Sequence, residues 1–266
     1  MGEAKLRSAG IGVCIYCGEL EGLSDEHIVP YGLGGNLVLK KSSCSACAKI
    51  TGKLEQQLLR GHWWPQRLRA GLQSRTKHKE VEPLNATVIR GDNSEFAAQL
   101  PRNEQTAFVE LGFSRPSILS GRVSSGEPFA EFPTIRFLGP LPNSYILEGQ
   151  RIALRGEEQI RLPLDYSAIE LSRLLAKVGH SYAISKKGLT YCREYFLPAI
   201  ILGNTEGALT YIGNASSELL GARLPGNEFH ALMERRNGDF LTVYVQLFRM
   251  IGDPPPVYEV VVGSLK

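Results

Sequence analysis

Residues 14–47 decide the fold of the N-terminal part of the chain, and they read CIYCGELEGLSDEHIVPYGLGGNLVLKKSSCSAC. Two Cys-x-x-Cys pairs frame this stretch, Cys14 with Cys17 and Cys44 with Cys47, and 26 residues separate the pairs. Two thiolates from a tight turn and two from the first turn of a helix can bind zinc as a closed tetrahedron. Because such a site leaves no open coordination position, we expect a structural zinc that fastens a segment with little core of its own.

The segment between the two pairs carries Asp25, Glu26 and His27 in direct succession, followed by an apolar pair and a proline. A neutral imidazole can take a proton from water, and a neighbouring carboxylate can hold Mg²⁺ or Mn²⁺ against a scissile phosphate. A short β-hairpin between the cysteine pairs would hold both groups on one rigid element. The pattern therefore favours hydrolysis of a phosphodiester.

The runs CIYCG, DEHIVPYGLGG and SCSACAKITGKLE together resemble the HNH endonuclease family, in the branch whose ββα-metal hairpin is clasped by a four-cysteine zinc. The resemblance covers residues 13–60 and lies in the order, spacing and types of these residues. It implies that His27 is the general base and that Glu26, or Asp25 beside it, binds the catalytic Mg²⁺ or Mn²⁺. It also implies that the four cysteines bind the structural zinc and that Asn36 steadies the hairpin loop.

The sequence departs from the family pattern at Ala48, where the family usually has Asn or His as a further ligand of the catalytic metal. Alanine cannot bind a cation, so Thr51 and Glu55, one and two helical turns further on, are the candidates to replace that ligand. Glu55 has two ordinary alternatives, a solvated helix position or an ion pair with Arg60. Two functions follow: a divalent-metal-dependent endonuclease acting on DNA, or an HNH-fold zinc module that binds nucleic acid without cleaving it.

The charge of the chain is unevenly distributed. The formal net charge is only +3, but residues 1–90 hold 13 Lys and Arg against 8 Asp and Glu. Scattered basic side chains suffice to contact a nucleic-acid backbone through its phosphates, although any one of them could equally be an ordinary solvated residue. Five of them are candidates for phosphate contacts: Lys40, Lys41, Lys49, Lys53 and Arg60.

The chain as a whole has the pattern of an α+β protein. Its expected parts are a leader over residues 1–12, a zinc-stapled ββα-metal module over 13–62, a basic connector over 63–83, and a larger α+β accessory domain with antiparallel strands over 84–266. In the module we expect a helix that is capped by Ser42 or Ser43 and ends at Arg60. Trp63, at the head of the connector, is expected to pack against the module.

Hydrophobic patterning beyond the module predicts further elements. The expected strands are Thr87–Ile89, Ala107–Leu111 and Thr134–Leu138, and the expected helix covers 167–186 with Ile169, Leu171, Leu174, Leu175 and Val178 as its apolar positions. Phe240–Met250 and Val257–Val262 are expected to form a terminal antiparallel pair around a turn at Asp253–Pro256. His180 is expected to be a satisfied structural residue, and Cys192 a small buried one.

The sequence also limits where the chain acts and with what. No apolar run approaches the roughly 20 residues of a membrane span, and the N-terminus lacks the apolar stretch of a secretory signal. Paired cysteines in such a chain favour metal over disulfides, so we expect a cytoplasmic protein without membrane contact. The HNH resemblance implies DNA as its partner. Residues 84–266 have three open roles: substrate positioning, formation of a homodimer, or sensing.

Overall fold

The structure is a computed structural model of the whole chain, and it describes most of its residues. The described residues are 10–61, 63–72, 83–100, 108–121, 134–138, 142–161, 167–204, 206–216, 219, 224, 229–249 and 255–266. Residues 1–9 of the expected leader, 73–82 of the expected connector and 253–254 of the expected turn therefore lie outside them.

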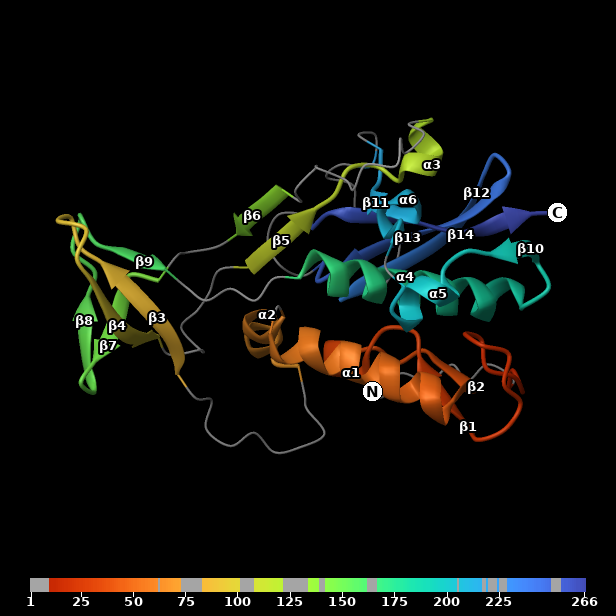
Figure 1. Cartoon of the computed structure of the whole chain (residues 1–266), viewed down its shortest axis with the longest axis horizontal. Coiled ribbons are helices and arrows are strands. Elements are labelled where there is room, and N and C mark those ends of the chain that lie inside the picture. The colour runs from red at the N-terminus through yellow and green to blue at the C-terminus, as the bar shows by residue number, and fades with distance from the viewer. Residues whose placement is uncertain are drawn as a thin grey trace.

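The N-terminal part is a two-stranded antiparallel hairpin that leads directly into a helix (Figure 1). Strand β1 (Leu23–His27) pairs with β2 (Val38–Cys44), and helix α1 (Ser45–Arg60) follows without a break. The short 3-10 helix η1 (Tyr31–Leu33) lies in the connection between the strands.

Helix α1 ends at the predicted residue but begins later than predicted. Its N-cap is Cys44, with no side-chain hydrogen bond, and Ser42 and Ser43 are buried in β2 instead. The predicted cap was therefore wrong, because strand pairing continues up to the cysteine. One stripe of α1 is buried, at spacings of four, three and four residues, as an amphipathic helix requires. It consists of Cys47, Thr51, Leu54 and Leu58.

The C-terminal part is a five-stranded antiparallel sheet with the order β10-β14-β13-β12, in which β11 also pairs with β14. Its strands are β10 (Cys192–Tyr195), β11 (Ile212–Asn214), β12 (His230–Asn237), β13 (Phe240–Leu247) and β14 (Val257–Leu265). The predicted terminal antiparallel pair is thus confirmed as β13 and β14.

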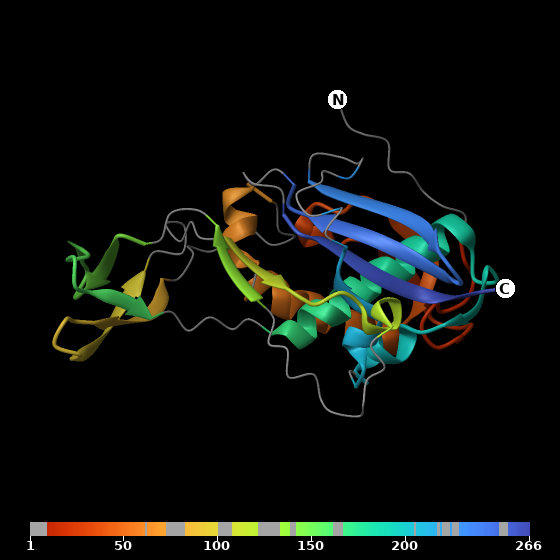
Figure 2. The same cartoon turned by 90° about the horizontal axis from the view of Figure 1, so that it is seen from above.

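Helix α4 (Ala168–Lys187) lies between this sheet and α1 (Figures 1 and 2). Its N-cap is Ser167, whose hydroxyl accepts the backbone N–H of Glu170 at 3.2 Å. Gly179 faces the sheet so closely that an added Cβ would stand 2.7 Å from a methyl carbon of Val260. One predicted apolar position was wrong: Ile169, in the first turn of α4, is 56% exposed, whereas Ser172 and Ala176 further along the same side are buried.

A second five-stranded antiparallel sheet lies to one side of this body, at the left of Figures 1 and 2. Its strands are β3 (Leu84–Ile89), β4 (Glu95–Leu100), β7 (Ser144–Leu147), β8 (Gln150–Ala153) and β9 (Gln159–Arg161). It has a small core of its own, made of Ala86, Val88, Ala98, Leu100 and Tyr145.

The remaining elements are short. They are the strand pair β5 (Phe108–Gly112) and β6 (Thr134–Leu138), and the helices α2 (Trp64–Arg69), α3 (Ser117–Ser120), α5 (Pro198–Leu202) and α6 (Ala208–Tyr211). The α+β class with antiparallel sheets is confirmed. Within the described residues, no helix combines the length and apolar composition that a bilayer crossing requires.

The hydrophobic core joins the hairpin and α1 to the C-terminal sheet. One cluster of buried residues includes Leu39 and Leu54 on one side and Leu174 and Val243 on the other. Trp63 belongs to the same cluster, and its ring meets that of Phe248 edge to face at 5.7 Å between centroids. The N-terminal part is thus packed as one layer of a larger body.

Candidate metal centre and the adjoining buried ion cluster

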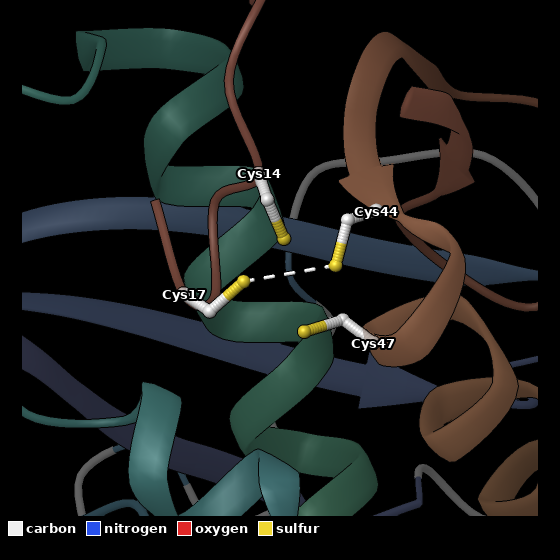
Figure 3. A group of neighbouring side chains, drawn as sticks. All are labelled: Cys14, Cys17, Cys44 and Cys47. Atoms are coloured by element: carbon white, nitrogen blue, oxygen red, sulfur yellow. Dashed lines mark hydrogen bonds between the residues drawn. The ribbon is translucent and has the colours of Figure 1, made fainter. Parts of the chain in front are cut away.

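The four paired cysteines come together at one point. Cys14 and Cys17 lie in the loop before β1, Cys44 ends β2, and Cys47 lies in the first turn of α1. All four sulfur atoms lie within 4.8 Å of one another, and Figure 3 shows them pointing toward a common centre. The Sγ atoms of Cys17 and Cys44 are 3.6 Å apart, close to the roughly 3.8 Å expected between thiolates bound tetrahedrally at about 2.3 Å from zinc. The four cysteines are therefore positioned to bind a metal ion, consistent with a structural zinc.

Backbone hydrogen bonds hold the first cysteine pair in place. The N–H of Gly18 donates to the carbonyl of Cys14 at 2.9 Å, and its φ of +80° is one that glycine adopts without strain. The N–H of Ile15 donates to the carbonyl of Ser42 at 2.8 Å, which ties this turn to β2. Because the turn and the hairpin are fixed to each other, the two cysteine pairs are held side by side.

The protonation of the cysteines also fits a cation. The backbone N–H of Cys47 lowers the pKa of the Cys44 thiol to about 7. Burial, followed by the neighbouring sulfurs, raises the pKa of Cys47. Four crowded thiols cannot all ionise on their own, and a dication at their centre removes this conflict.

Next to the cysteines, the acids before His27 do not share one side of β1. Asp25 is exposed, Glu26 is buried and His27 is half-buried, as the alternation of a strand dictates. The carboxylate of Asp25 accepts the backbone N–H of Lys41 at 3.1 Å, at a bulge where Lys41 has a φ of +48°. Asp25 therefore has a structural partner in the hairpin, and Glu26 faces the interior.

Glu26 pairs with a lysine that lies far away in the sequence. The ammonium of Lys177, from α4, lies 2.8 Å from Oε1 of Glu26 and 2.8 Å from Oε1 of Glu55. It also donates to the backbone carbonyls of His27 and Ile28. The Lys177 side chain has no exposed surface, and those of Glu26 and Glu55 are 7% and 20% exposed.

Lys177 is charged in this setting. Burial on its own lowers the pKa of a lysine, but the charges of Glu26 and Glu55 outweigh that effect, so the pKa of Lys177 is raised. Glu55 is thus not an ordinary solvated helix residue, because its side chain is only 20% exposed and contacts an internal ammonium. Glu26 and Glu55 contact the same ammonium.

The other residues named from the sequence lie as follows. The ring of His27 meets that of Tyr31 edge to face at 5.8 Å between centroids, and the Tyr31 ring is 43% exposed. Asn36 is exposed, Ala48 is half-buried, and the hydroxyl of Thr51 donates to the carbonyl of Ala48 at 3.4 Å. Of the two residues considered as replacements for the missing ligand, Glu55 contacts Lys177, as Glu26 does, and the Thr51 hydroxyl bonds within its own helix. The basic residues Lys41, Lys49, Lys53 and Arg60 are exposed, and Lys40 is half-buried.

Sequence reasoning missed a polar stripe on α4, formed by Lys177, His180 and Ser181. Nε2 of His180 donates to the carbonyl of Ile15 at 2.8 Å, and burial lowers the pKa of His180 to about 4. The hydroxyls of Ser181 and Tyr16 lie 3.3 Å apart. A signal was available, because these polar residues recur at positions i, i+3 and i+4 inside an otherwise apolar run. The prediction that His180 has a structural role agrees with these contacts, as does the burial of Cys192, which is 5% exposed.

No protein-family model, curated protein or solved structure matches the chain in sequence or fold comparisons.

Proposed function

We propose that residues 13–62 form an HNH-type zinc module that binds DNA. The observation that carries the proposal is the cysteine cluster at the junction of β2 and α1, with His27 as the last residue of the hairpin's first strand. A hairpin followed directly by a helix, with four cysteines positioned to bind a metal ion, supports this proposal. The rigid frame would present its surface to a nucleic-acid backbone.

Charge supports contact with phosphates. Lys41 lies on β2 and Lys49, Lys53 and Arg60 lie on α1, and all four side chains are exposed. Each phosphate contact releases counterions, so binding of this kind weakens steeply as salt rises. Phosphate contacts also carry no sequence information, and we expect little preference among DNA sequences from them.

The catalytic cation of HNH enzymes does not fit the residues of this chain. Of its two expected acidic ligands, Glu26 is turned inward and contacts the ammonium of Lys177, and Asp25 accepts the backbone N–H of Lys41. The side chain of Ala48 offers no ligand atom. A divalent cation contributes several kcal/mol to the stabilisation of a phosphoryl transition state, which corresponds to a factor of about a thousand in rate. We therefore favour DNA binding without efficient cleavage and write no reaction step through a metal.

Hydrolysis is the second candidate, and the position of His27 favours it. The imidazole ends β1 and is half-buried beside the exposed ring of Tyr31. In this case His27 takes a proton from a water molecule, the water oxygen bonds to phosphorus, and the bond to the leaving deoxyribose oxygen breaks as that oxygen is protonated by solvent. The surface lysines would offset part of the phosphate charge.

One experiment separates binding from cleavage. A labelled DNA duplex is titrated with the zinc-loaded full chain while fluorescence anisotropy is recorded, and plasmid nicking is followed in parallel with and without Mg²⁺. We expect binding that weakens with salt and is unchanged by Mg²⁺ and by His27→Ala. Nicking that requires His27 would establish the second candidate, and absence of both binding and nicking would refute the assignment.

A matched pair of variants tests the surface. Lys49→Ala/Lys53→Ala removes two positive charges from α1, and Arg193→Ala/Lys266→Ala removes the same charge from exposed positions at β10 and the C-terminus. We expect the first pair to weaken DNA binding and to reduce its salt dependence, and the second to leave both unchanged. Equal effects of the two pairs would mean that only net charge matters.

A further inference from the structure

The surroundings of the Lys177 ammonium have the composition of a cation site. Four oxygen atoms contact it: one from each carboxylate of Glu26 and Glu55, and the backbone carbonyls of His27 and Ile28. Carboxylate and carbonyl oxygens are the ligands that hard divalent cations such as Mg²⁺ and Mn²⁺ select. An ammonium has three N–H donors, so these four acceptors exceed what one lysine can satisfy.

The charges of the cluster also favour a divalent cation. Two carboxylates face one ammonium, and Lys177 is fully buried and Glu26 nearly so. A divalent ion would balance the two carboxylates. The cluster also adjoins the cysteine frame through the backbone of β1, which supplies both Glu26 and the carbonyl of His27.

We propose that Lys177 is a resident cation that occupies a divalent-cation position between β1 and α1. Helix α4 supplies the positive charge permanently, so the N-terminal part keeps its acids buried without a second metal. Replacement of Lys177 by a residue with a short neutral side chain leaves this position empty and creates a site for Mn²⁺ or Mg²⁺. Lys177 thus holds the carboxylates of Glu26 and Glu55 in place.

This inference goes beyond the proposed function, because it concerns cation binding and holds whether or not the chain touches DNA. Three forms of the zinc-loaded full chain are compared: wild type, Lys177→Ala, and Lys177→Ala/Glu26→Gln. Free Mn²⁺ is counted by electron paramagnetic resonance during a titration. We expect Lys177→Ala to bind about one Mn²⁺ more per chain than wild type, and Glu26→Gln to weaken that binding by more than about tenfold.

Thermal unfolding of the same three forms, with and without Mn²⁺ at constant ionic strength, gives a second measurement. Mn²⁺ should raise the midpoint of Lys177→Ala and leave those of wild type and the double variant unchanged. Should Lys177→Ala prove unfolded, refolding with Mn²⁺ replaces the titration, and recovery of the native circular dichroism is expected.

Three results would overturn the proposal. They are equal Mn²⁺ binding by wild type and Lys177→Ala, Mn²⁺ binding by the variant that Glu26→Gln does not weaken, and an unfolded variant that Mn²⁺ fails to rescue. None of these readouts involves DNA. A failure of the DNA-binding proposal therefore leaves this test intact, and a failure here leaves the DNA titration unaffected.

Discussion

The substitution Lys177→Met should destabilise the folded chain by about 3–5 kcal/mol, the usual consequence of removing one partner of a buried ion pair. Methionine retains most of the length and the apolar stem of lysine, so packing is largely kept and the charge is lost. At an effective dielectric of about 20, each 2.8 Å contact with Glu26 or Glu55 contributes about 6 kcal/mol of attraction. The desolvation cost of the three ions offsets much of this attraction, and solvent near the partly exposed Glu55 screens its attraction to Lys177.

Urea unfolding at neutral pH, followed by circular dichroism, measures this effect. Lys186→Met is the control, because Lys186 lies on the same helix but is exposed, and it should change stability by no more than about 1 kcal/mol. Adding Glu26→Gln to Lys177→Met should recover part of the loss, since it removes the stranded carboxylate. A loss below about 1 kcal/mol in Lys177→Met would show that the ammonium does not neutralise the two acids, and the reasoning would fail.

Three further outcomes are expected. Metal analysis should find about one zinc per chain, and Cys44→Ser should release it and unfold the N-terminal part, because structural zinc contributes on the order of 10 kcal/mol in small modules. Gly35→Ala should destabilise the fold by more than about 2 kcal/mol in thermal unfolding, because the added Cβ would stand 2.0 Å from the Val29 carbonyl oxygen. Gly52→Ala is the control: it lies inside α1 with open space around it, and it should stabilise the fold by about 0.5–1 kcal/mol. Burial lowers the pKa of His230 to about 4 from an ordinary 6.5, so the unfolded chain takes up this proton first as pH falls and stability drops by about 3 kcal/mol between those values. His230→Gln should flatten that part of the pH profile of urea unfolding, and an unchanged slope would show that His230 does not titrate on unfolding.

Local patterns in the sequence predicted local structure well. The two Cys-x-x-Cys pairs predicted a four-sulfur cluster, because each pair is a tight turn or a helical first turn whatever surrounds it. Helix α4 and strands β13 and β14 follow from periodicity within single segments. The N-cap of α1 was misplaced, because a serine that could cap a helix can also be a paired strand residue.

Contacts between residues far apart in the chain could not be predicted from the sequence. The partner of Glu26 lies about 150 positions away on α4, and no spacing rule links two residues at that separation. The sequence showed an acid beside a histidine and suggested that both face a phosphate. Strand alternation turns Glu26 to the opposite side, where an internal lysine meets it. Lys177, placed within the mostly apolar run from Leu174 to Ile184 of α4, was the visible sign of a buried acidic partner.

Helix α4 packs against two parts of the molecule. Gly179 contacts β14. Hydrogen bonds from Lys177, His180 and Ser181 join the helix to β1 and to the loop of the first cysteine pair. Neither part can leave the helix without disturbing the other. Metal binding by the cysteines would therefore stabilise the C-terminal sheet as well, and thermodynamic reciprocity would apply in both directions. A molecule that binds only the folded sheet would raise the affinity of the cysteines for the metal, and metal loading would raise the affinity of the sheet for that molecule.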